Sequence, residues 1–469
     1  MSQQRDMPTL RSAQTRHDED LERVVIVGVQ LDGVSGDDAE ASLDELGSLV
    51  MSAGGAVVGR LSQKRAKPDP ATFIGRGKVL EIVEEVGLSN ADTVVFDEEL
   101  APSQLRNLEE KISSSGRQTK VIDRTILILD IFAQRATSIE GKKQVELAQL
   151  TYGLPRLRGW GEALTRIGGA SGGGGRGGGG GRAPIGTRGP GETQLEVDRR
   201  RIQRRIQKLK KDLEELGKRR ARTRAHREAR VPTVSLVGYT NAGKSTLLNH
   251  LTDAGVVTED RLFTTLDPTA RRLRLPSREP VVISDTVGFI RKLPHGLVEA
   301  FQSTLEQVAS ADLLIHVVDA SHPEPDADVA AVDEVLGEIG ATEVMRLLAL
   351  NKLDLLDDAE RDRLLTRFPD AVGISAVTGE GVDALLARVQ QVIESRATDV
   401  EALIPYSEGT LLGRLHDSGR VVESVHEADG VRVKLKARPA DLGPLARYLS
   451  PDGGGETTST SPRGDTEPT

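Results

Sequence analysis

The stretch Gly238-Tyr239-Thr240-Asn241-Ala242-Gly243-Lys244-Ser245 decides the fold of the central part of this chain. It follows a short apolar run, residues 234–237, and leads into a helical pattern that begins at Thr246. A strand, a glycine-containing loop and a helix N-terminus in this order form a phosphate-binding P-loop. Backbone N–H groups and the helix dipole then attract phosphate oxygens. We expect Lys244 to neutralise the β and γ phosphates and the Ser245 hydroxyl to ligate Mg²⁺.

Two further segments suit a site that responds to the γ-phosphate. An apolar run at 281–284 precedes Asp285-Thr286-Val287-Gly288, where the carboxylate can hold magnesium through water and the Gly288 amide can bind the γ-phosphate. Upstream, Phe263-Thr264-Thr265-Leu266-Asp267 lies where a threonine hydroxyl completes magnesium coordination in the triphosphate state, and Thr265 is the predicted ligand. Because hydrolysis removes the γ-phosphate, a segment held only by that group is a natural switch.

The choice of base is predicted by a third motif. Asn351-Lys352-Leu353-Asp354 follows the apolar run 347–350. The Asp354 carboxylate can accept two hydrogen bonds from guanine N1 and N2, which adenine cannot offer, while Lys352 covers the base. Backbone groups of Ser375-Ala376-Val377 can meet the guanine O6. These motifs, in this order, predict a GTPase that binds GTP and GDP rather than an ATPase.

The group that orients the attacking water is less clear from the sequence. In Ras-like proteins a glutamine follows the switch glycine, but here that position holds Phe289. Backbone and magnesium alone could position the water, with very slow turnover. Asn241 could instead ligate a potassium ion that acts as a fixed positive charge, or a partner could supply the missing group. The candidate catalytic residues are therefore Lys244, Thr265, Gly288 and Asn241.

Composition and charge exclude several classes of protein and indicate a possible partner. The chain has 469 residues, which predicts about two to four domains, and it has no cysteine, which excludes disulfides and thiolate chemistry. No secretory signal or membrane-spanning run is visible, so we expect a cytoplasmic protein, while peripheral membrane association stays open. The net charge is -9, yet fifteen Lys or Arg oppose five Asp or Glu between Asp198 and Arg230. This local excess indicates either RNA contact or only a solvated helix face.

The pattern of apolar runs predicts an α/β fold in several parts. We expect disordered tails at 1–21 and 451–469, an N-terminal α/β domain at 22–125 with a parallel sheet, a helical hairpin with a Gly-rich loop at 126–230, a GTPase domain at 231–398 and a small α+β domain at 399–450. Eleven glycines within 168–181 predict a flexible linker or a loop that orders on a ligand. The hairpin would pair a helix at 127–150 with a helix whose apolar stripe is Leu195, Ile202, Ile206, Leu209, Leu213 and Leu216.

Several motifs together resemble the HflX family of translation-associated GTPases, in the Obg-HflX superfamily. They are Thr72-Phe73-Ile74-Gly75-Arg76-Gly77-Lys78, Val145-Glu146-Leu147-Ala148-Gln149-Leu150, Leu154-Pro155-Arg156-Leu157 and Gly189-Pro190-Gly191-Glu192-Thr193-Gln194-Leu195-Glu196, followed by Arg199-Arg200-Arg201. The resemblance implies a monomeric GTPase that binds the large ribosomal subunit near the peptidyl transferase centre and separates stalled or idle ribosomes under stress. It also implies that the N-terminal domain and the hairpin contact rRNA.

Two other functions fit the nucleotide motifs. The protein could assist large-subunit assembly or tRNA modification, or it could be a nucleotide-gated RNA-binding scaffold with incidental turnover. The nucleotide motifs alone do not distinguish these functions from ribosome splitting.

Overall fold

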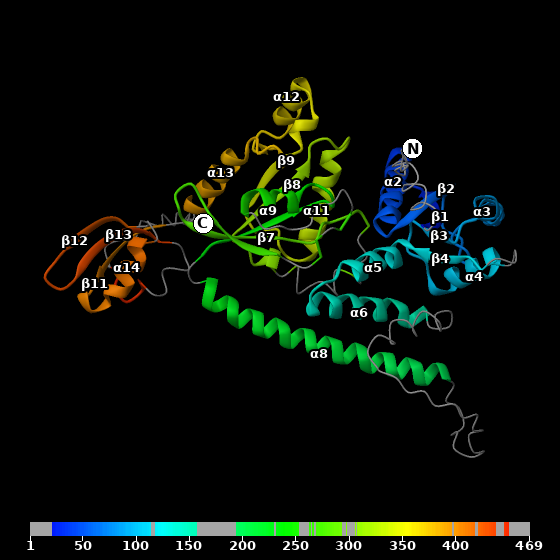
Figure 1. Cartoon of the computed structure of the whole chain (residues 1–469), viewed down its shortest axis with the longest axis horizontal. Helices are drawn as coiled ribbons and strands as arrows, with labels where there is room; N and C mark the ends of the chain where they lie inside the picture. The colour runs from blue at the N-terminus through cyan, green and yellow to red at the C-terminus, as the bar shows by residue number, and fades with distance from the viewer. Residues whose placement is uncertain are drawn as a thin grey trace, which may run out of the picture.

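The computed structural model shows three β-sheets in sequence along a long molecule (Figure 1). The predicted tails and the Gly-rich loop lie outside the described residues. The structure describes residues 21–113, 118–156, 194–228, 231–252, 262–263, 265–266, 269–292, 297, 305, 307–395, 398–417, 421–437 and 445–449.

The N-terminal sheet has the parallel order β2-β1-β3-β4, which confirms the predicted parallel α/β arrangement. Parallel neighbours need crossover connections, and helices supply them here. The strands bury apolar side chains such as Val25, Ile26 and Val95 between these helices. The elements are β1 (Glu22–Leu31), α2 (Gly36–Ser52), β2 (Gly55–Arg65), α3 (Arg76–Ser89), β3 (Thr93–Phe96), α4 (Pro102–Ser113), β4 (Lys120–Asp123) and α5 (Arg124–Arg135).

The single helix predicted at 127–150 is wrong, because the structure divides it into α5 and α6 (Ile139–Gly153). The backbone at Ala136 is extended, which ends α5. The Ser138 hydroxyl then accepts a hydrogen bond from the Gly141 amide at 2.8 Å and caps α6. α5 belongs to the core of the N-terminal sheet, where its Phe132 is buried. A 3₁₀ turn, η1 (Leu154–Arg156), follows α6.

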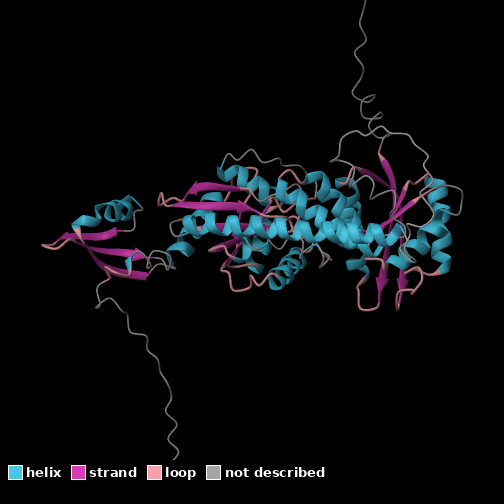
Figure 2. Ribbon diagram, turned by 90° about the horizontal axis from the view of Figure 1, so that it is seen from below, coloured by secondary structure: helices cyan, strands magenta, loops and turns pink. Residues whose placement is uncertain are grey.

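The predicted pairing with a long helix is found for α6 and α8 (Gln194–Glu228). Ile202 and Leu209 of α8 are buried against Leu147 and Leu150 of α6. Two ion pairs flank this seam, Arg205 with Glu146 and Lys143 with Asp212. Seen from below, α8 crosses the molecule from the central part to the N-terminal part (Figure 2). The predicted apolar stripe is therefore confirmed at these positions, and the Lys and Arg side chains described between residues 199 and 218 of α8 are exposed.

The central sheet has the order β10-β9-β8-β5-β7-β6, in which β6 alone among the described strands runs antiparallel. β5 lies inside the sheet, so the P-loop begins at the middle of its carboxyl edge. The elements are β5 (Thr233–Gly238), α9 (Lys244–Thr252), β6 (Ala270–Arg274), β7 (Pro280–Asp285), β8 (Leu313–Asp319), α11 (Pro325–Glu338), β9 (Arg346–Asn351), η2 (Leu353–Leu355), α12 (Asp358–Arg367), β10 (Val372–Gly373) and α13 (Val382–Ser395).

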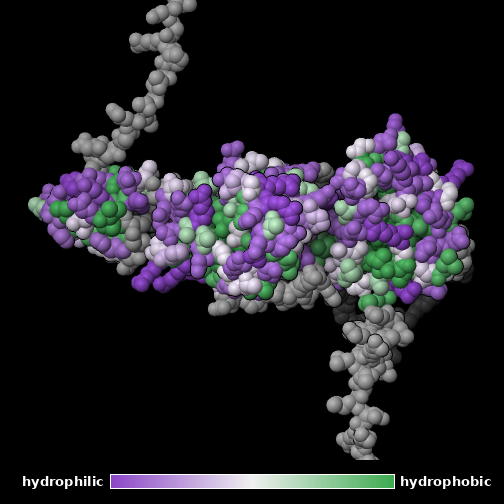
Figure 3. All heavy atoms as spheres, turned by 90° about the horizontal axis from the view of Figure 1, so that it is seen from above, coloured by the Kyte–Doolittle hydropathy of each residue, from purple (hydrophilic) through white to green (hydrophobic). Residues whose placement is uncertain are grey.

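Within the residues that the structure describes there, the C-terminal part is a three-stranded antiparallel sheet with one α-helix. Along β13, Val431, Val433 and Leu435 are buried while Lys434 and Lys436 are exposed, so alternate residues of this strand face the core. Figure 3, viewed from above, shows a largely hydrophilic surface over the central part. No helix in the described ranges is long and apolar enough to cross a membrane. The elements are β11 (Thr398–Ile404), η3 (Tyr406–Glu408), α14 (Gly409–Asp417), β12 (Val421–His426) and β13 (Val431–Ala437).

A buried histidine lies on β8, beneath the nucleotide loops. His316 is fully buried, and within the described part of the chain neither ring nitrogen has a hydrogen-bond partner. Burial, reinforced by the cations Arg346 and Lys244, lowers the pKa of His316 to about 3. The imidazole is therefore neutral in the folded protein at neutral pH.

This histidine makes stability depend on pH. The unfolded histidine takes up a proton below its ordinary pKa of about 6.5, whereas the folded one does not, so stability falls as pH drops below that value. We expect His316→Leu to remove a slope of about 1.4 kcal/mol per pH unit from the unfolding free energy of the central domain between pH 6 and 4. Denaturant unfolding of the wild type and of His316→Leu at several pH values measures the unfolding free energy and hence this slope. Parallel pH profiles would contradict the expectation.

Candidate functional site

The P-loop follows β5 with a backbone that requires glycine at two positions. Gly238 has φ 151°, and a Cβ there would lie 2.2 Å from the Val317 carbonyl oxygen. Gly243 has φ 93°, and a Cβ there would lie 2.2 Å from Nδ2 of Asn351. A side chain at either position would displace neighbouring strands or the loop itself. The two glycines therefore set the curve of the loop.

Lys244, at the first turn of α9, is held by the loop that precedes it. Its Nζ donates to the carbonyl oxygens of Gly238 at 3.0 Å and Tyr239 at 2.7 Å. The residue is 6% exposed, so its charge is partly removed from water. Burial lowers the pKa of Lys244 to about 8, while the Asp285 carboxylate raises it. The two carbonyl oxygens thus fix the position of the ammonium.

Three oxygen-bearing side chains meet beside Lys244. The Ser245 hydroxyl donates to Oδ2 of Asp285 at 2.6 Å and lies 2.7 Å from Oγ1 of Thr265. Burial raises the pKa of Asp285, opposed by the Lys244 cation and by hydrogen bonds from Ser245 and Thr265. An all-oxygen set with a buried carboxylate suits a hard cation such as Mg²⁺. The structure therefore brings together the two predicted magnesium ligands and Asp285.

The loop around Thr265 is only partly described. Phe263 and Leu266 are buried on either side of it, and Phe263 has a positive φ of 58°. Thr264 and Asp267, the other predicted residues of this loop, lie outside the described residues. Thr265 approaches Ser245, and its role as the magnesium ligand of this loop stays a prediction.

The segment after β7 is joined to the P-loop through its backbone. The Phe289 amide donates to the Gly238 oxygen at 3.1 Å, and the Thr240 amide donates to the Phe289 oxygen at 2.8 Å. A Cβ at Gly288 would lie 2.9 Å from Cγ2 of Thr240, so this glycine permits the close approach. Phe289 itself is buried, which removes its side chain from any role in orienting water. Thr286 and Val287, predicted in the same motif, are also buried.

Where the guanine base is expected to bind, the Asn351 side chain joins the P-loop to the loop 375–377. Its Nδ2 donates to the Ala242 oxygen at 2.8 Å, and its Oδ1 accepts from the Ala376 amide at 2.9 Å. This bracing role was not predicted from the sequence. The amide groups of one side chain therefore link the P-loop to the Ser375-Ala376-Val377 loop, where Val377 is 73% exposed.

Lys352 and Asp354 flank the same end. Lys352 has a left-handed backbone with φ 68°, and its Nζ lies 2.5 Å from Oδ2 of Asp319. Asp354, on the short helix η2, is exposed to solvent and thus available to a base. Asp319 is a residue that sequence reasoning missed, although its place at the carboxyl end of the buried strand β8 was a usable signal. It orients the lysine predicted to cover the base.

Two predicted residues, Asn241 and Thr246, are less buried than Lys244 and Ser245. Asn241 is exposed at the tip of the P-loop with φ 60°. Thr246 is half-buried in the first turn of α9. The loop of residues 239–243 joins β5 to α9, and the carbonyl oxygens of Gly238 and Tyr239 hold the Lys244 ammonium.

Four family models match consecutive parts of the chain. Their descriptions are GTP-binding GTPase N-terminal for residues 40–133, GTP-binding GTPase Middle Region for residues 135–227, 50S ribosome-binding GTPase for residues 233–352 and HflX C-terminal domain for residues 364–452. Together they cover the central and C-terminal sheets, the N-terminal sheet apart from β1, and the α6 and α8 helices described above.

Individual relatives agree with these matches. A protein called GTPase HflX from Caldanaerobacter subterraneus subsp. tengcongensis is 45% identical over 418 residues, which is 89% of this chain and 91% of that protein. GTPase HflX of Escherichia coli is 44% identical over 400 residues, 84% of this chain and 89% of that protein. Among solved structures, a GTP-binding protein from Sulfolobus solfataricus in complex with GDP covers 79% of this chain and 98% of its own at 25% identity, with a TM-score of 0.41. The identity to the two HflX proteins, along most of both chains, shows that this protein belongs to the HflX family of GTPases.

Proposed function

We propose that this GTPase binds the large ribosomal subunit in its GTP form, separates stalled or idle ribosomes, and is released after hydrolysis. The supporting observation is the match of residues 233–352 to a family described as 50S ribosome-binding GTPase. The long cationic helix α8 adds a surface suited to rRNA phosphates. We further propose that the protein works as a cytoplasmic monomer.

We assign the phosphates, the base and Mg²⁺ to different residues of the site. Lys244 neutralises the β and γ phosphates, and the Gly288 amide binds the γ-phosphate. Asp354 accepts from guanine N1 and N2 while the loop 375–377 meets O6. Ser245 and Thr265 would hold Mg²⁺, with Asp285 through water, and the bound ion would offset charge on the phosphate oxygens. Loss of the γ-phosphate frees Gly288 and its neighbours.

Asn241 is the candidate ligand for potassium. Phe289 cannot orient water, so another group must assist hydrolysis, and a further fixed positive charge near the phosphates would do so by stabilising charge in the transition state. If Asn241 ligates potassium at the exposed tip of the P-loop, replacing potassium by sodium should slow hydrolysis about tenfold or more. Phosphate release in matched chloride salts measures this, with Asn241→Ala as the variant expected to lose the preference. Equal wild-type rates in the two salts would end this hypothesis.

The exposed face of α8 is the candidate contact with rRNA. Arg200 and Arg204 lie on this face, away from the buried seam with α6. Affinity for the large subunit should fall as salt rises, and a plot of log affinity against log salt gives the steepness of that fall. Replacing both arginines by Ala should reduce the steepness by about one for each phosphate that is no longer neutralised. Replacing Lys434 and Lys436, two exposed cations of β13, is the matched control and should leave the slope unchanged. An unaltered slope in the Arg200/Arg204 variant would mean that this face contacts only solvent and not rRNA.

Ribosome splitting is tested with purified components. Co-sedimentation with isolated large subunits should be strong with a non-hydrolysable GTP analogue and weak with GDP. Light scattering of intact 70S particles should fall when protein and GTP are added, as the particles separate. Binding without a fall in scattering would favour subunit assembly, and binding to free RNA alone would favour an RNA scaffold.

A further inference from the structure

The nucleotide-binding part contacts the N-terminal sheet at the carboxyl edge of that sheet. The N-terminal sheet has the strand order β2-β1-β3-β4, so the chain passes from β1 to β2 on one side and then returns to β3 on the other side of β1. In parallel sheets, ligands bind outside the carboxyl edge at such a switch point. Asp97 and Glu98 follow β3 at this point. The Lys292 ammonium, from the segment after Gly288, lies 2.7 Å from Asp97 and 2.5 Å from Glu98. A residue of the GTPase part thus occupies a position where such folds hold ligands.

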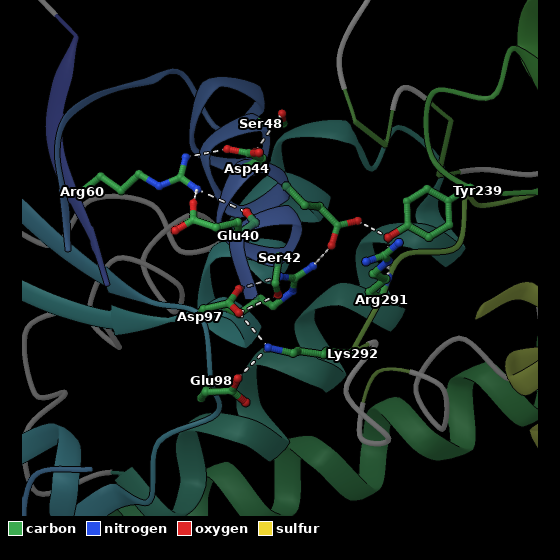
Figure 4. Close-up of polar contacts among 12 residues, drawn as sticks. Glu40, Ser42, Asp44, Ser48, Arg60, Asp97, Glu98, Tyr239, Arg291 and Lys292 are labelled. Carbon is green, nitrogen blue, oxygen red and sulfur yellow. Dashed lines mark hydrogen bonds and ion pairs between the residues drawn. The ribbon is translucent and has the colours of Figure 1, made fainter. Parts of the chain in front are cut away.

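A buried ionic network lies next to this contact (Figure 4). Arg124, the first residue of α5, is 2% exposed and pairs with Asp97 at 2.6 Å and with Glu45 of α2. The Ser42 hydroxyl donates to Asp97 at 2.6 Å. Groups buried in this way have no water to replace a missing partner, so their hydrogen bonds depend on one another.

One phenol joins this network to the nucleotide site. The Tyr239 hydroxyl donates to the Glu45 carboxylate and accepts from the Arg291 amide at 2.7 Å (Figure 4). Burial, together with the Glu45 charge, raises the pKa of Tyr239, so the phenol keeps its proton and acts as the donor. Tyr239 belongs to the P-loop, Arg291 lies three residues after Gly288, and Glu45 belongs to the N-terminal domain. Three separate segments therefore share one hydroxyl group.

The second loop of the nucleotide site also contacts the N-terminal domain. The Leu262 amide donates to the Ser52 hydroxyl at 2.9 Å. The Phe263 ring packs edge-on against Phe132 of α5, with centroids 4.7 Å apart. Both loops expected to respond to the γ-phosphate therefore contact the N-terminal domain. Of the two contacts, the one at Tyr239 connects to buried charges, which respond most to a small displacement.

We propose that Tyr239 is a positioning residue that couples the nucleotide state to the N-terminal domain through Glu45. When the segment after Gly288 shifts, the Arg291 amide leaves the phenol, and Glu45 must then redistribute its hydrogen bonds between Tyr239 and Arg124. The change reaches Asp97 and the carboxyl edge of the N-terminal sheet. The inference rests on the GTPase assignment and not on ribosome binding.

Hydrogen exchange on the full-length protein tests this coupling. With saturating GDP or a non-hydrolysable GTP analogue, deuterium uptake of residues 40–50 and 93–98 should differ between the two nucleotides in the wild type. In Tyr239→Phe, which keeps the ring and removes the hydroxyl, that difference should fall by half or more. The control Tyr406→Phe removes a hydroxyl that bonds the Glu427 oxygen in the C-terminal part, and it should keep the full difference. No nucleotide-dependent difference in the wild type, or an undiminished one in Tyr239→Phe, would overturn the proposal.

A second variant separates coupling from general loosening of the fold. Glu45→Gln keeps the size of the side chain but replaces by an NH₂ donor one of the two oxygens that accept separately from Arg124 and Tyr239. It should reduce the nucleotide-dependent difference as Tyr239→Phe does, and the double variant should show no greater reduction than either single one. Additive reductions, or equal increases of uptake in both nucleotide states, would mean a purely structural role. Failure of every variant and the wild type to bind nucleotide would instead refute the GTPase assignment.

Discussion

Replacing Lys244 by Met is expected to reduce the rate of GTP hydrolysis by about a thousandfold. The ammonium is placed by the oxygens of Gly238 and Tyr239, so in the proposed role its charge would meet the phosphates with little reorganisation. Preorganised groups of this kind contribute roughly 10²–10³ in rate each. Methionine keeps most of the apolar stem while removing the charge and the two hydrogen bonds. Phosphate release under saturating GTP measures the effect.

A control shows whether the reduced rate comes from this charge. Lys434→Met removes an exposed cation of β13, distant in sequence from the P-loop, and should leave hydrolysis unchanged. Circular dichroism should show that both variants are folded. Hydrolysis by Lys244→Met within a few-fold of the wild type would mean that the phosphates are bound elsewhere.

Replacing Asp354 by Asn is expected to shift the preference from guanine to xanthine nucleotides. The carboxylate would lose its charge-assisted hydrogen bonds to guanine N1 and N2, each worth about 1.5–3 kcal/mol, while the new amide can donate to the xanthine oxygen. The two bonds total about 3 kcal/mol or more, so GTP affinity should fall at least about a hundredfold, and XTP affinity should rise. Displacement of a fluorescent nucleotide measures both. The exposed Asp362 on α12 provides the matched control, Asp362→Asn, and retained GTP preference in Asp354→Asn would contradict the base assignment.

The fold was largely predictable because its strands are short apolar runs between helical patterns. β1, β3 and β5 are buried on both faces, and such strands predict a parallel sheet. The break between α5 and α6 was missed because apolar residues continue through 127–150 at helical spacing. The pair Thr137-Ser138 was a capping signal, but only tertiary packing of α5 into the N-terminal core decides that the chain turns there.

The nucleotide motifs could be found from the sequence because each follows a strand. The carboxyl ends of β5, β7 and β9 meet at one edge, which brings together residues such as Lys244, Asp285 and Asn351. The bond between Tyr239 and Glu45 joins residues 194 positions apart. No periodicity or motif encodes a contact between two domains at that separation, so the link appeared only in the folded structure.

Calorimetric titration of the purified protein with GTP in the presence of Mg²⁺ tests the central claim most directly. We predict saturable binding at one site per chain, absent with ATP and weakened in Lys244→Met. No heat of binding with GTP, or equal binding of ATP, would contradict the assignment of a guanine nucleotide site between the P-loop and the 375–377 loop.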